Sequence, residues 1–465
     1  MVNHEYRFKP YTRNSIKDAP QWKYLTPSQQ EAVLAISRVL PFRVNAYVLD
    51  ELIDWGNIPD DPIFRLTFPH RDMLQPAELE ALCNIEGGRA SASENDLIKR
   101  MRLDMNPHPA GQLTHNVPHL QGQPIEGLQH KYRETVLFFP SAGQTCHTYC
   151  TFCFRWPQFV GMNELKFDAK DARTLVDYLK VHKNVTDVLI TGGDPMIMNT
   201  RSLAGYIEPL LAPELSHIQN IRIGTKSVAY WPQRFVTDSD ADDVLRLFEK
   251  VVASGKNLAV MGHYNHPAEL RPAFAQQAVR RIVATGATVR MQAPLIRHIN
   301  EDPDGWAELW TTGVKLGAIP YYMFVERDTG PRSYFELPLA RAYEIFQQAY
   351  QQVSGLARTV RGPSMSAHPG KVVIDGIVQL AGEKVFALQF LQARNPNWVR
   401  RPFYARFDPH ATWFDQLRPA FGESRFFFEQ EAHAGASSII FPPVRENPTV
   451  AIAVNSDVDH RATVS

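Results

Sequence analysis

The sequence has 465 residues, of which 44% are hydrophobic, so the chain can bury a substantial core. Lysine plus arginine and aspartate plus glutamate both number 49, so no net charge attracts nucleic acid or an anionic membrane. No run of about 18 apolar residues occurs that could form a membrane-spanning helix, and the N-terminus MVNHEYRFKPYTRNSIKD lacks the apolar part of a secretion signal. We therefore expect a cytoplasmic protein with neither nucleic-acid nor membrane partners.

Residues 1–120 are predicted to form a helical extension followed by a connector. Candidate helices cover residues 28–38 and 77–85, in stretches without Pro or Gly. The stretch 106–124 is rich in Pro, Gly and His, a composition that is typical of connecting segments.

Residues 121–355 show short apolar runs that alternate with amphipathic stretches, which predicts a parallel sheet with helices outside it. Six strand units are too few for a closed eight-stranded barrel. The predicted fold is therefore α/β, a partial (β/α)6 TIM-like barrel with N-terminal and C-terminal extensions. The expected strands are 135–139, 187–190, 221–223, 258–260, 288–291 and 319–324, and the expected helices are 169–181, 241–253, 267–284 and 306–316.

Residues 356–465 form a C-terminal segment in which this alternation is lost. The stretch GPSMSAHPG (362–370) is predicted to be a loop that ends at Lys371. Residues 372–380 and 384–391 are predicted to pair as a hairpin. The aromatic run 426–428 is expected to pack, and the polar tail from 442 is expected to fray.

Three of the four cysteines, Cys146, Cys150 and Cys153, lie in the segment CHTYCTFC. This spacing would place all three sulfurs on one side of a tight loop or helical turn. Three thiolates from one loop can bind three irons of a [4Fe-4S] cluster and leave the fourth iron open for chemistry. A structural zinc site with His147 as a fourth ligand is an alternative, and a disulfide framework is another, although four cysteines are sparse for it.

Polar clusters follow successive predicted strands, so the chain should bring them to one edge of the sheet, where ligands gather in such folds. The cysteine loop follows the first strand, and the segment TGGDP follows the second. Adjacent glycines let the backbone approach a ligand closely. The residues expected at this edge, besides the cysteines, are Gly192, Gly193, Asp194, Thr225, Lys226, His263 and Gln292.

The CxxxCxxC loop followed by TGGDP resembles the radical S-adenosylmethionine superfamily. The segments NPHPAG, GLQHKY, RIGTK, PQR and HYNHP are similar to those of the lysine 2,3-aminomutase family, over roughly residues 100–385. The resemblance implies that the cluster and S-adenosyl-L-methionine generate a 5′-deoxyadenosyl radical, which removes a hydrogen from an amino acid. The amino group then moves from the α to the β carbon, so the protein would be an isomerase. A reducing partner such as flavodoxin or ferredoxin would donate the electron.

The resemblance also implies pyridoxal 5′-phosphate, with Lys371 as the catalytic lysine that attaches it. Lys131 and Tyr132 match a basic–aromatic pair that the family places on this cofactor. The family's glycine run before the lysine is shortened here, and a second expected arginine is replaced by Thr135, for which Arg133 is a candidate substitute.

Three further residues are implied to bind the substrate. Arg155 matches the residue that pairs with the substrate carboxylate, a role that suits a planar guanidinium. The two aspartates that receive the distal ammonium in the lysine enzymes are replaced by Glu301 and Arg327, and an arginine would repel an ammonium. Either the register is off by one, with Glu326 or Asp328 in this role, or the substrate carries a distal carboxylate or both charges.

Three functions stay open at this stage. The first is a radical aminomutase that depends on pyridoxal phosphate. The second is a radical enzyme without pyridoxal phosphate that epimerises, decarboxylates or rearranges an amino-acid-like substrate. The third is a non-catalytic zinc-binding module. In the family, zinc-binding cysteines near the C-terminus stabilise the arrangement of subunits. These cysteines are absent here, so the question whether the chain forms a homo-oligomer stays open.

Overall fold

The computed structural model describes residues 7–85, 91–107, 113–162 and 165–433. The predicted fraying of the tail beyond residue 442 lies outside the described residues, as does most of the NPHPAG segment. No described helix combines the length and the apolar character that crossing a bilayer requires.

The fold centres on an 11-stranded sheet in which β6 to β12 pair in parallel and the strands at both edges are antiparallel. Its strand order is β15-β14-β13-β12-β11-β10-β9-β8-β7-β6-β5, so sequence neighbours are also neighbours in the sheet. The strands are β5 (Leu128–Tyr132), β6 (Thr135–Phe138), β7 (Asp187–Ile190), β8 (Asn220–Thr225), β9 (Asn257–His263), β10 (Thr288–Leu295), β11 (Ala318–Val325), β12 (Arg361–Ser366), β13 (Gly370–Leu380), β14 (Glu383–Ala393) and β15 (Pro402–Arg406).

The six predicted strands of the parallel sheet are confirmed as β6 to β11, most of them longer than expected. Three strands of this sheet, β5, β12 and β15, were not expected. In β5, His130 occupies a buried position between Leu128 and Tyr132, so the strand shows no apolar alternation. The prediction of a loop over 362–370 is wrong, because residues 361–366 form β12. Gly362 allows this strand to approach β11, since a Cβ there would lie 2.5 Å from the Met323 carbonyl oxygen.

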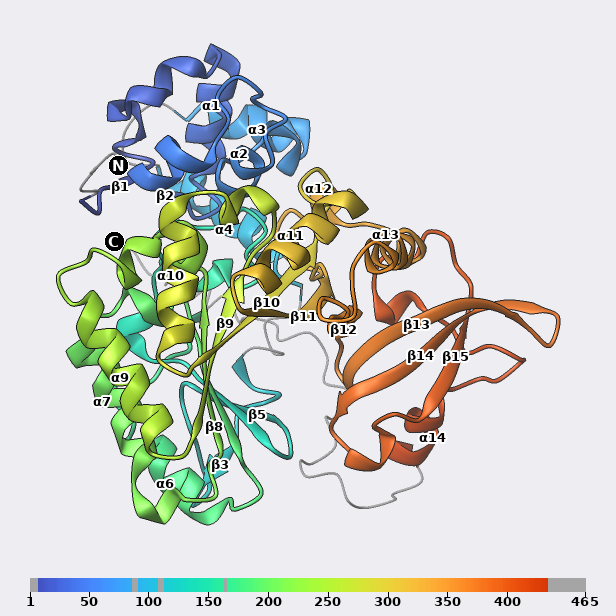
Figure 1. The fold of residues 1–465 in the computed structure, drawn as a ribbon. Helices are drawn as coiled ribbons and strands as arrows, with labels where there is room; N and C mark the ends of the chain where they lie inside the picture. Colours follow the sequence, from blue (N-terminus) through green and yellow to red (C-terminus); the bar gives the residue numbers. More distant parts are fainter. Residues whose placement is uncertain (1–6, 86–90, 108–112, 163–164, 434–465) are drawn as a thin grey trace, which may run out of the picture.

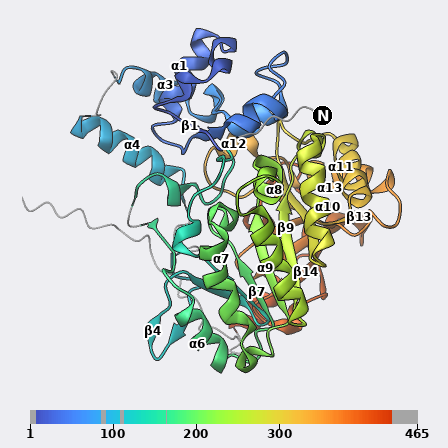
Figure 2. The same cartoon turned by 60° about the vertical axis from the view of Figure 1, so that its left-hand side comes forward.

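Helices cover the outer side of the parallel strands, and α9 shows why they form (Figures 1 and 2). Its buried residues Val244, Leu247, Phe248 and Val251 recur with helical spacing, so one stripe faces the sheet. The helices that connect or follow the parallel strands are α6 (Arg173–Val181), α7 (Thr200–Ile207), α8 (Ser227–Tyr230), α9 (Ala241–Ala253), α10 (Ala273–Ala284), α11 (Pro303–Lys315), α12 (Arg332–Phe335) and α13 (Leu339–Gln351).

The N-terminal segment forms a helical cap above the sheet, drawn in blue in Figure 1. The expected helices over 28–38 and 77–85 are confirmed, with slightly shifted ends. The cap contains α1 (Pro27–Ile36), α2 (Pro62–Thr67), α3 (Pro76–Cys83), α4 (Ala92–Asp104) and the short antiparallel strands β1 (Pro10–Thr12) and β2 (Arg43–Asn45), and the small pair β3 (His119–Leu120) and β4 (Gln123–Pro124) follows it.

The C-terminal strands extend the sheet beyond β12 and are drawn in orange at the right of Figure 1. The predicted hairpin is confirmed as β13 and β14, which turn at Ala381 and Gly382, both with positive φ. A separate apolar core forms against these strands, and the aromatic run packs into it through Phe426 and Phe428, partly on α14 (Phe427–His433). The expectation that this run serves packing is confirmed.

Candidate active site

The three cysteines of CHTYCTFC lie in the loop after β6, and all three line one cavity of about 1800 Å³. The same cavity is lined by residues on or shortly after β7 to β10 that the sequence placed at this edge, namely Gly192, Gly193, Asp194, Thr225, Lys226, His263 and Gln292. The structure therefore brings together the polar clusters that follow successive strands, as the parallel topology requires.

The N-terminal cap holds the cysteine loop from outside. The Tyr149 N–H donates to the Arg43 carbonyl at 2.8 Å, and the Thr151 N–H donates to the Leu66 carbonyl at 2.9 Å. The Arg43 side chain also donates to Thr145 Oγ1 at 2.9 Å. The cap thus has a positional role that the sequence did not reveal.

Asn45, at the end of β2, is the central residue of this attachment and is completely buried. Its Nδ2 donates to Thr148 Oγ1 at 3.0 Å and to the Tyr230 carbonyl at 2.8 Å, and its Oδ1 accepts from the Val48 N–H at 3.1 Å. One side chain therefore joins the cap, the cysteine loop and α8. A single asparagine in a short strand carries no sequence signal for such a role.

The chemistry of the three thiols fits an iron–sulfur cluster. Burial raises the pKa of all three, to about 12 for Cys150 and about 11 for Cys153. Their thiolates therefore need a bound cation, as metal ligands do. Among the described residues, no group of three His, Cys, Asp or Glu side chains is placed to hold a metal ion. A cluster does not require the sulfurs to meet at one ion, because each thiolate binds a different iron.

His147, the fourth ligand of the zinc alternative, faces the protein instead. Its Nδ1 lies 2.8 Å from Ser227 Oγ, and its ring stacks on Trp231 with a centroid separation of 6.1 Å. Burial lowers its pKa to about 3, so the imidazole is neutral. This arrangement gives no support to a zinc site completed by His147.

The two glycines of TGGDP allow one loop to rest on another. A Cβ on Gly192 would lie 2.3 Å from Gln144 Nε2, and a Cβ on Gly193 would lie 2.5 Å from the Thr145 amide nitrogen. The Asp194 N–H donates to the Thr145 carbonyl at 2.8 Å. In the structure, the backbone at Gly192 and Gly193 lies close to the residues that precede Cys146. A close approach of this backbone to a ligand stays a prediction.

The Asp194 carboxylate joins the ends of β7 and β8. One oxygen accepts from Thr225 Oγ1 at 2.7 Å and from the Met196 N–H at 2.9 Å. The other accepts from the Lys226 N–H at 2.9 Å and from the N–H and the hydroxyl of Ser227, both at 3.0 Å. The structure gives Asp194 and Thr225 a bracing role, and their direct contact with a cofactor stays a prediction.

Lys226 is likewise tied to the protein. Its Nζ pairs with Glu269 Oε1 at 2.6 Å and donates to Asn265 Oδ1 at 2.8 Å, and Glu269 is completely buried. Lys226 therefore brings a satisfied ion pair to the cavity wall.

His263 offers a free polar atom beside this pair. Its Nε2 is buried and has no hydrogen-bond partner among the described residues. Burial and the nearby Lys226 hold its pKa well below the usual range, so the ring is neutral. Together with Gln292 in the same wall, His263 provides the kind of free donor or acceptor that a ribose or adenine group needs.

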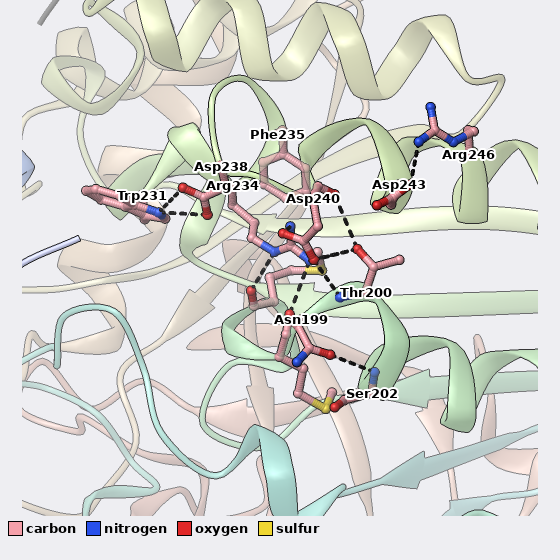
Figure 3. A network of polar contacts seen from close by, with 12 residues as sticks. Asn199, Thr200, Ser202, Trp231, Arg234, Phe235, Asp238, Asp240, Asp243 and Arg246 are labelled. Atoms are coloured by element: carbon pink, nitrogen blue, oxygen red, sulfur yellow. Dashed lines mark hydrogen bonds and ion pairs between the residues drawn. The ribbon is translucent and has the colours of Figure 1, made fainter. Parts of the chain in front are cut away.

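Arg234 of the PQR segment braces the loop after β7 (Figure 3). It is buried, and its guanidinium donates to the carbonyls of Met196 and Met198, both at 3.1 Å. It also pairs at 2.9 Å with Asp240, which accepts from the Thr200 N–H at the start of α7. The segment therefore has a structural role in holding the loop that carries the glycine turn.

Lys371 lies at the start of β13 and lines the same cavity as the cysteine loop. Its Nζ lies 4.1 Å from the centroid of the Tyr322 ring, and it makes no ion pair with any described residue. Burial, followed by the charges of Arg222 and Arg361, lowers its pKa to about 7. With a pKa near 7, about half of the amine is uncharged at neutral pH, and the uncharged form is the one that attaches to an aldehyde cofactor.

Two cations hold the turn that leads to Lys371. Lys131 on β5 donates from Nζ to the Ala367 carbonyl, and its buried amine has a pKa lowered well below the usual value. Arg394, which follows β14, donates to the His368 carbonyl at 2.9 Å. Both side chains line the cavity together with Tyr132. Sequence reasoning missed Arg394, because only the hairpin brings it to this place.

The two other positions considered for the phosphate side have different settings. Thr135 is buried and lines the cavity, where its hydroxyl donates to Asp187 Oδ2 at 3.2 Å. Arg133 is exposed between β5 and β6 and does not line the cavity. Arg394 is therefore better placed than Arg133 to supply the missing positive charge.

Arg155 is a buried cation in the cavity wall. Its guanidinium lies 4.1 Å from the Phe139 ring centroid, and its Nε has no hydrogen-bond partner among the described residues. Burial lowers its pKa to about 10, while the nearby thiols of Cys153 and Cys146 act in the opposite direction. Arg155 can therefore receive an anion from inside the cavity.

The two residues predicted to contact the far end of a substrate are separated by the fold. Arg327, just after β11, lines the cavity, as do its neighbours Glu326 and Asp328. Glu301 does not line it, and its Oε1 accepts from the His298 N–H at 3.0 Å. In this structure the loop after β10 turns the Glu301 carboxylate back onto its own backbone, and its contact with a substrate stays a prediction.

Comparison with known proteins places this site in a family. A protein of Aquifex aeolicus provisionally named L-lysine 2,3-aminomutase is 30% identical to the chain over 381 residues, which cover 82% of the chain and 88% of that protein. The chain belongs to the lysine 2,3-aminomutase family of radical S-adenosylmethionine enzymes. The L-lysine 2,3-aminomutases of Acetoanaerobium sticklandii and Clostridium subterminale are each 25% identical to it, over 75% and 74% of the chain and 73% and 71% of their own lengths.

Two other comparisons add nothing to this assignment. No protein-family model matches the chain. A radical SAM methyltransferase from Sphaerobacter thermophilus resembles it with a TM-score of 0.35 and 18% identity, over 50% of this chain and 68% of that one.

Proposed function

We propose that this member of the lysine 2,3-aminomutase family is a radical S-adenosylmethionine amino acid 2,3-aminomutase that moves an amino group from the α to the β carbon. The observation that carries the proposal is Lys371, a half-buried lysine that makes no ion pair with any described residue and lines one cavity with the cysteine loop. A structural lysine would be expected to pair with a carboxylate or to reach solvent.

Three groups of residues would hold the cofactors. Cys146, Cys150 and Cys153 would bind a [4Fe-4S] cluster. S-adenosyl-L-methionine would lie between the glycine turn and the wall that carries His263 and Gln292, and pyridoxal 5′-phosphate would attach to Lys371. Bound there, these groups would supply a radical that removes hydrogen and a carrier for the migrating nitrogen.

The chain's own residues prepare this chemistry. Lys371 would present its neutral amine beside the Tyr322 ring. Lys131 and Arg394 would add positive charge on the side of the cavity where a phosphate is expected. Arg155 would hold the substrate carboxylate with its unpartnered Nε edge.

The wider architecture and the partners are part of the proposal. The strand order β6 to β11 and the single cavity at the carboxyl ends support the partial (β/α)6 barrel, with segment boundaries near residues 120 and 355. A reducing partner such as flavodoxin or ferredoxin would supply the electron. An amino acid or amino-acid-like compound would be the substrate.

Matched variants of the anaerobically reconstituted protein test the proposal. Borohydride reduction should fix pyridoxal phosphate on the peptide that contains Lys371, as read by mass spectrometry. Lys371→Ala should abolish this adduct and the formation of any β-amino acid, whereas Lys384→Ala on the adjacent strand β14 should change neither. If S-adenosylmethionine is cleaved reductively and no pyridoxal phosphate binds, the enzyme without pyridoxal phosphate becomes the better assignment.

A second set of variants tests the cluster. Replacing Cys146, Cys150 or Cys153 by alanine should remove most of the iron and acid-labile sulfide, whereas Cys83→Ala should retain both. Cys83 is suitable as the control because it does not line the cavity. Zinc without sulfide in the wild-type protein would favour the zinc-binding module instead.

A further inference from the structure

We propose that the substrate is an amino acid whose side chain ends in a carboxylate, and that Arg327 receives this distal group while Arg155 holds the α-carboxylate. This inference rests on the proposed function, since it names the substrate class of the same site. It starts from two arginines, Arg155 and Arg327, that line one cavity and whose buried Nε atoms have no hydrogen-bond partner among the described residues.

The surroundings of the Arg327 guanidinium suit the binding of an anion. It makes no ion pair with any described residue, and its Nε is buried without a hydrogen-bond partner. Its guanidinium carbon lies 5.4 Å from the Phe154 ring centroid and 5.9 Å from that of Trp413. Aromatic rings around a planar guanidinium leave its N–H edge available for a bidentate carboxylate. A buried N–H without an acceptor is costly, so a ligand oxygen that accepts from it gains affinity.

Arg155 has the same construction on another part of the wall. It lies against one aromatic ring, Phe139, and its Nε is also buried without a described partner. Lys371, which would carry the amino group through the cofactor, lines the same cavity. The cavity therefore offers separate receptors for two carboxylates and for one amine.

The carboxylates near Arg327 are the competing receptors for a basic substrate. Glu326 is buried, and burial raises the pKa of its carboxyl well above the usual range, which favours the uncharged form. Asp328 and Asp415 also line the cavity and engage in contacts of their own. The charges of Asp328 and Glu326 act on Arg327. Its buried Nε–H still has no hydrogen-bond partner among the described residues, so this edge is suited to receive a carboxylate rather than an ammonium.

The C-terminal segment supplies part of this receptor. Trp413 follows β15 and reaches the cavity next to Arg327. The N-terminal side of the receptor is Phe154, which directly follows Cys153 and is partly exposed. The substrate pocket is thus closed by a residue from beyond the parallel strands.

Calorimetric titration of the anaerobically reconstituted enzyme tests the inference independently of turnover. The probes are aspartate, glutamate, 2-aminoadipate and lysine, and their side-chain lengths report how far Arg327 lies from the α-carboxylate site. We expect one acidic probe to bind at least about 100-fold more tightly than lysine, as two charge-assisted hydrogen bonds imply. Tighter binding of lysine, or no binding of any acidic probe, would overturn the inference.

Three variants separate charge from packing. Arg327→Met should weaken binding of the preferred acidic probe by about 100-fold. Arg327→Lys should recover part of the affinity, because it restores the charge without the planar fork. Arg341→Met, on the surface of α13, is the control and should bind as the wild type does. An Arg327→Met protein that binds the acidic probe within about threefold of wild type contradicts the role of Arg327.

The two proposals fail in different ways. If an acidic probe binds through Arg327 but no β-amino acid forms, the assignment of the substrate class stands and the aminomutase function does not. If a β-amino acid forms from lysine, the aminomutase function stands and the substrate class is wrong.

Discussion

Replacing Asp194 by alanine tests how the strand ends at the active site are held together. The carboxylate accepts hydrogen bonds from Met196, Thr225, Lys226 and Ser227, all of them buried. In the alanine variant the Ser227 N–H keeps a contact with Thr225 Oγ1 at 2.9 Å, and the two hydroxyls can rotate. The N–H groups of Met196 and Lys226 lose their acceptor. At about 1–3 kcal/mol for each orphaned donor, the expected loss in the free energy of unfolding is about 2–6 kcal/mol.

Anaerobic denaturant unfolding of the apoprotein measures this loss, taken from the first transition because a chain of this size need not unfold in one step. Asp194→Asn should fall between wild type and alanine, since its remaining carbonyl oxygen can still accept from Met196 and Thr225. Asp243→Ala, which removes a surface pair with Arg246, should change the free energy by less than about 0.5 kcal/mol. If Asp194→Ala is equally mild, the bracing role assigned to Asp194 is refuted.

Three further predictions concern the amine, the cap and the glycine turn. The rate of Lys371 acylation should reach half its maximum near pH 7, when the free amine forms, rather than near the ordinary lysine value of about 10.4. The stability contributed by this group should rise between about pH 7 and 10.5, because the unfolded chain binds the additional proton in that range; a Lys371→Met variant should lose this rise in thermal melts. Asn45→Ala should lower the unfolding free energy by about 2–4 kcal/mol and reduce iron retention, and a variant with normal iron content and stability would contradict the attachment described for the cap. Gly193→Ala should lower the melting temperature and the iron content because its Cβ would lie 2.5 Å from the Thr145 nitrogen, whereas Gly205→Ala, with open space in α7, should be neutral or slightly stabilising.

The alternation of strands and helices could be predicted because each parallel strand is a short apolar run and each helix repeats its apolar residues with helical spacing. Two strands that were not predicted, β12 and β5, contain residues that depart from these patterns. β12 contains Gly, Pro and two serines and is a strand only because Gly362 fits against Met323. β5 carries His130 where an apolar residue would be expected.

The candidate site shows the same division. The motifs at the strand ends could be placed together from the sequence, because parallel strands bring their carboxyl ends to one edge. The separate role of each of these residues could not be predicted from the sequence, because it depends on which partner the side chain contacts. Asp194 and Lys226 face the protein, while His263 and Arg155 keep unpartnered atoms at the cavity.

By itself the sequence determined the cysteine loop, the glycine turn and the alternation of strands and helices, because each of these is a local pattern of residue types, whereas Lys371 was a candidate through the resemblance to a family. Only the tertiary structure decided what surrounds them. The cap reaches the cysteine loop through Asn45, the hairpin carries Arg394 to the turn before Lys371, and Trp413 arrives beside Arg327. These contacts join residues far apart in the chain, and a contact of that kind leaves no periodicity or spacing that a single sequence could reveal.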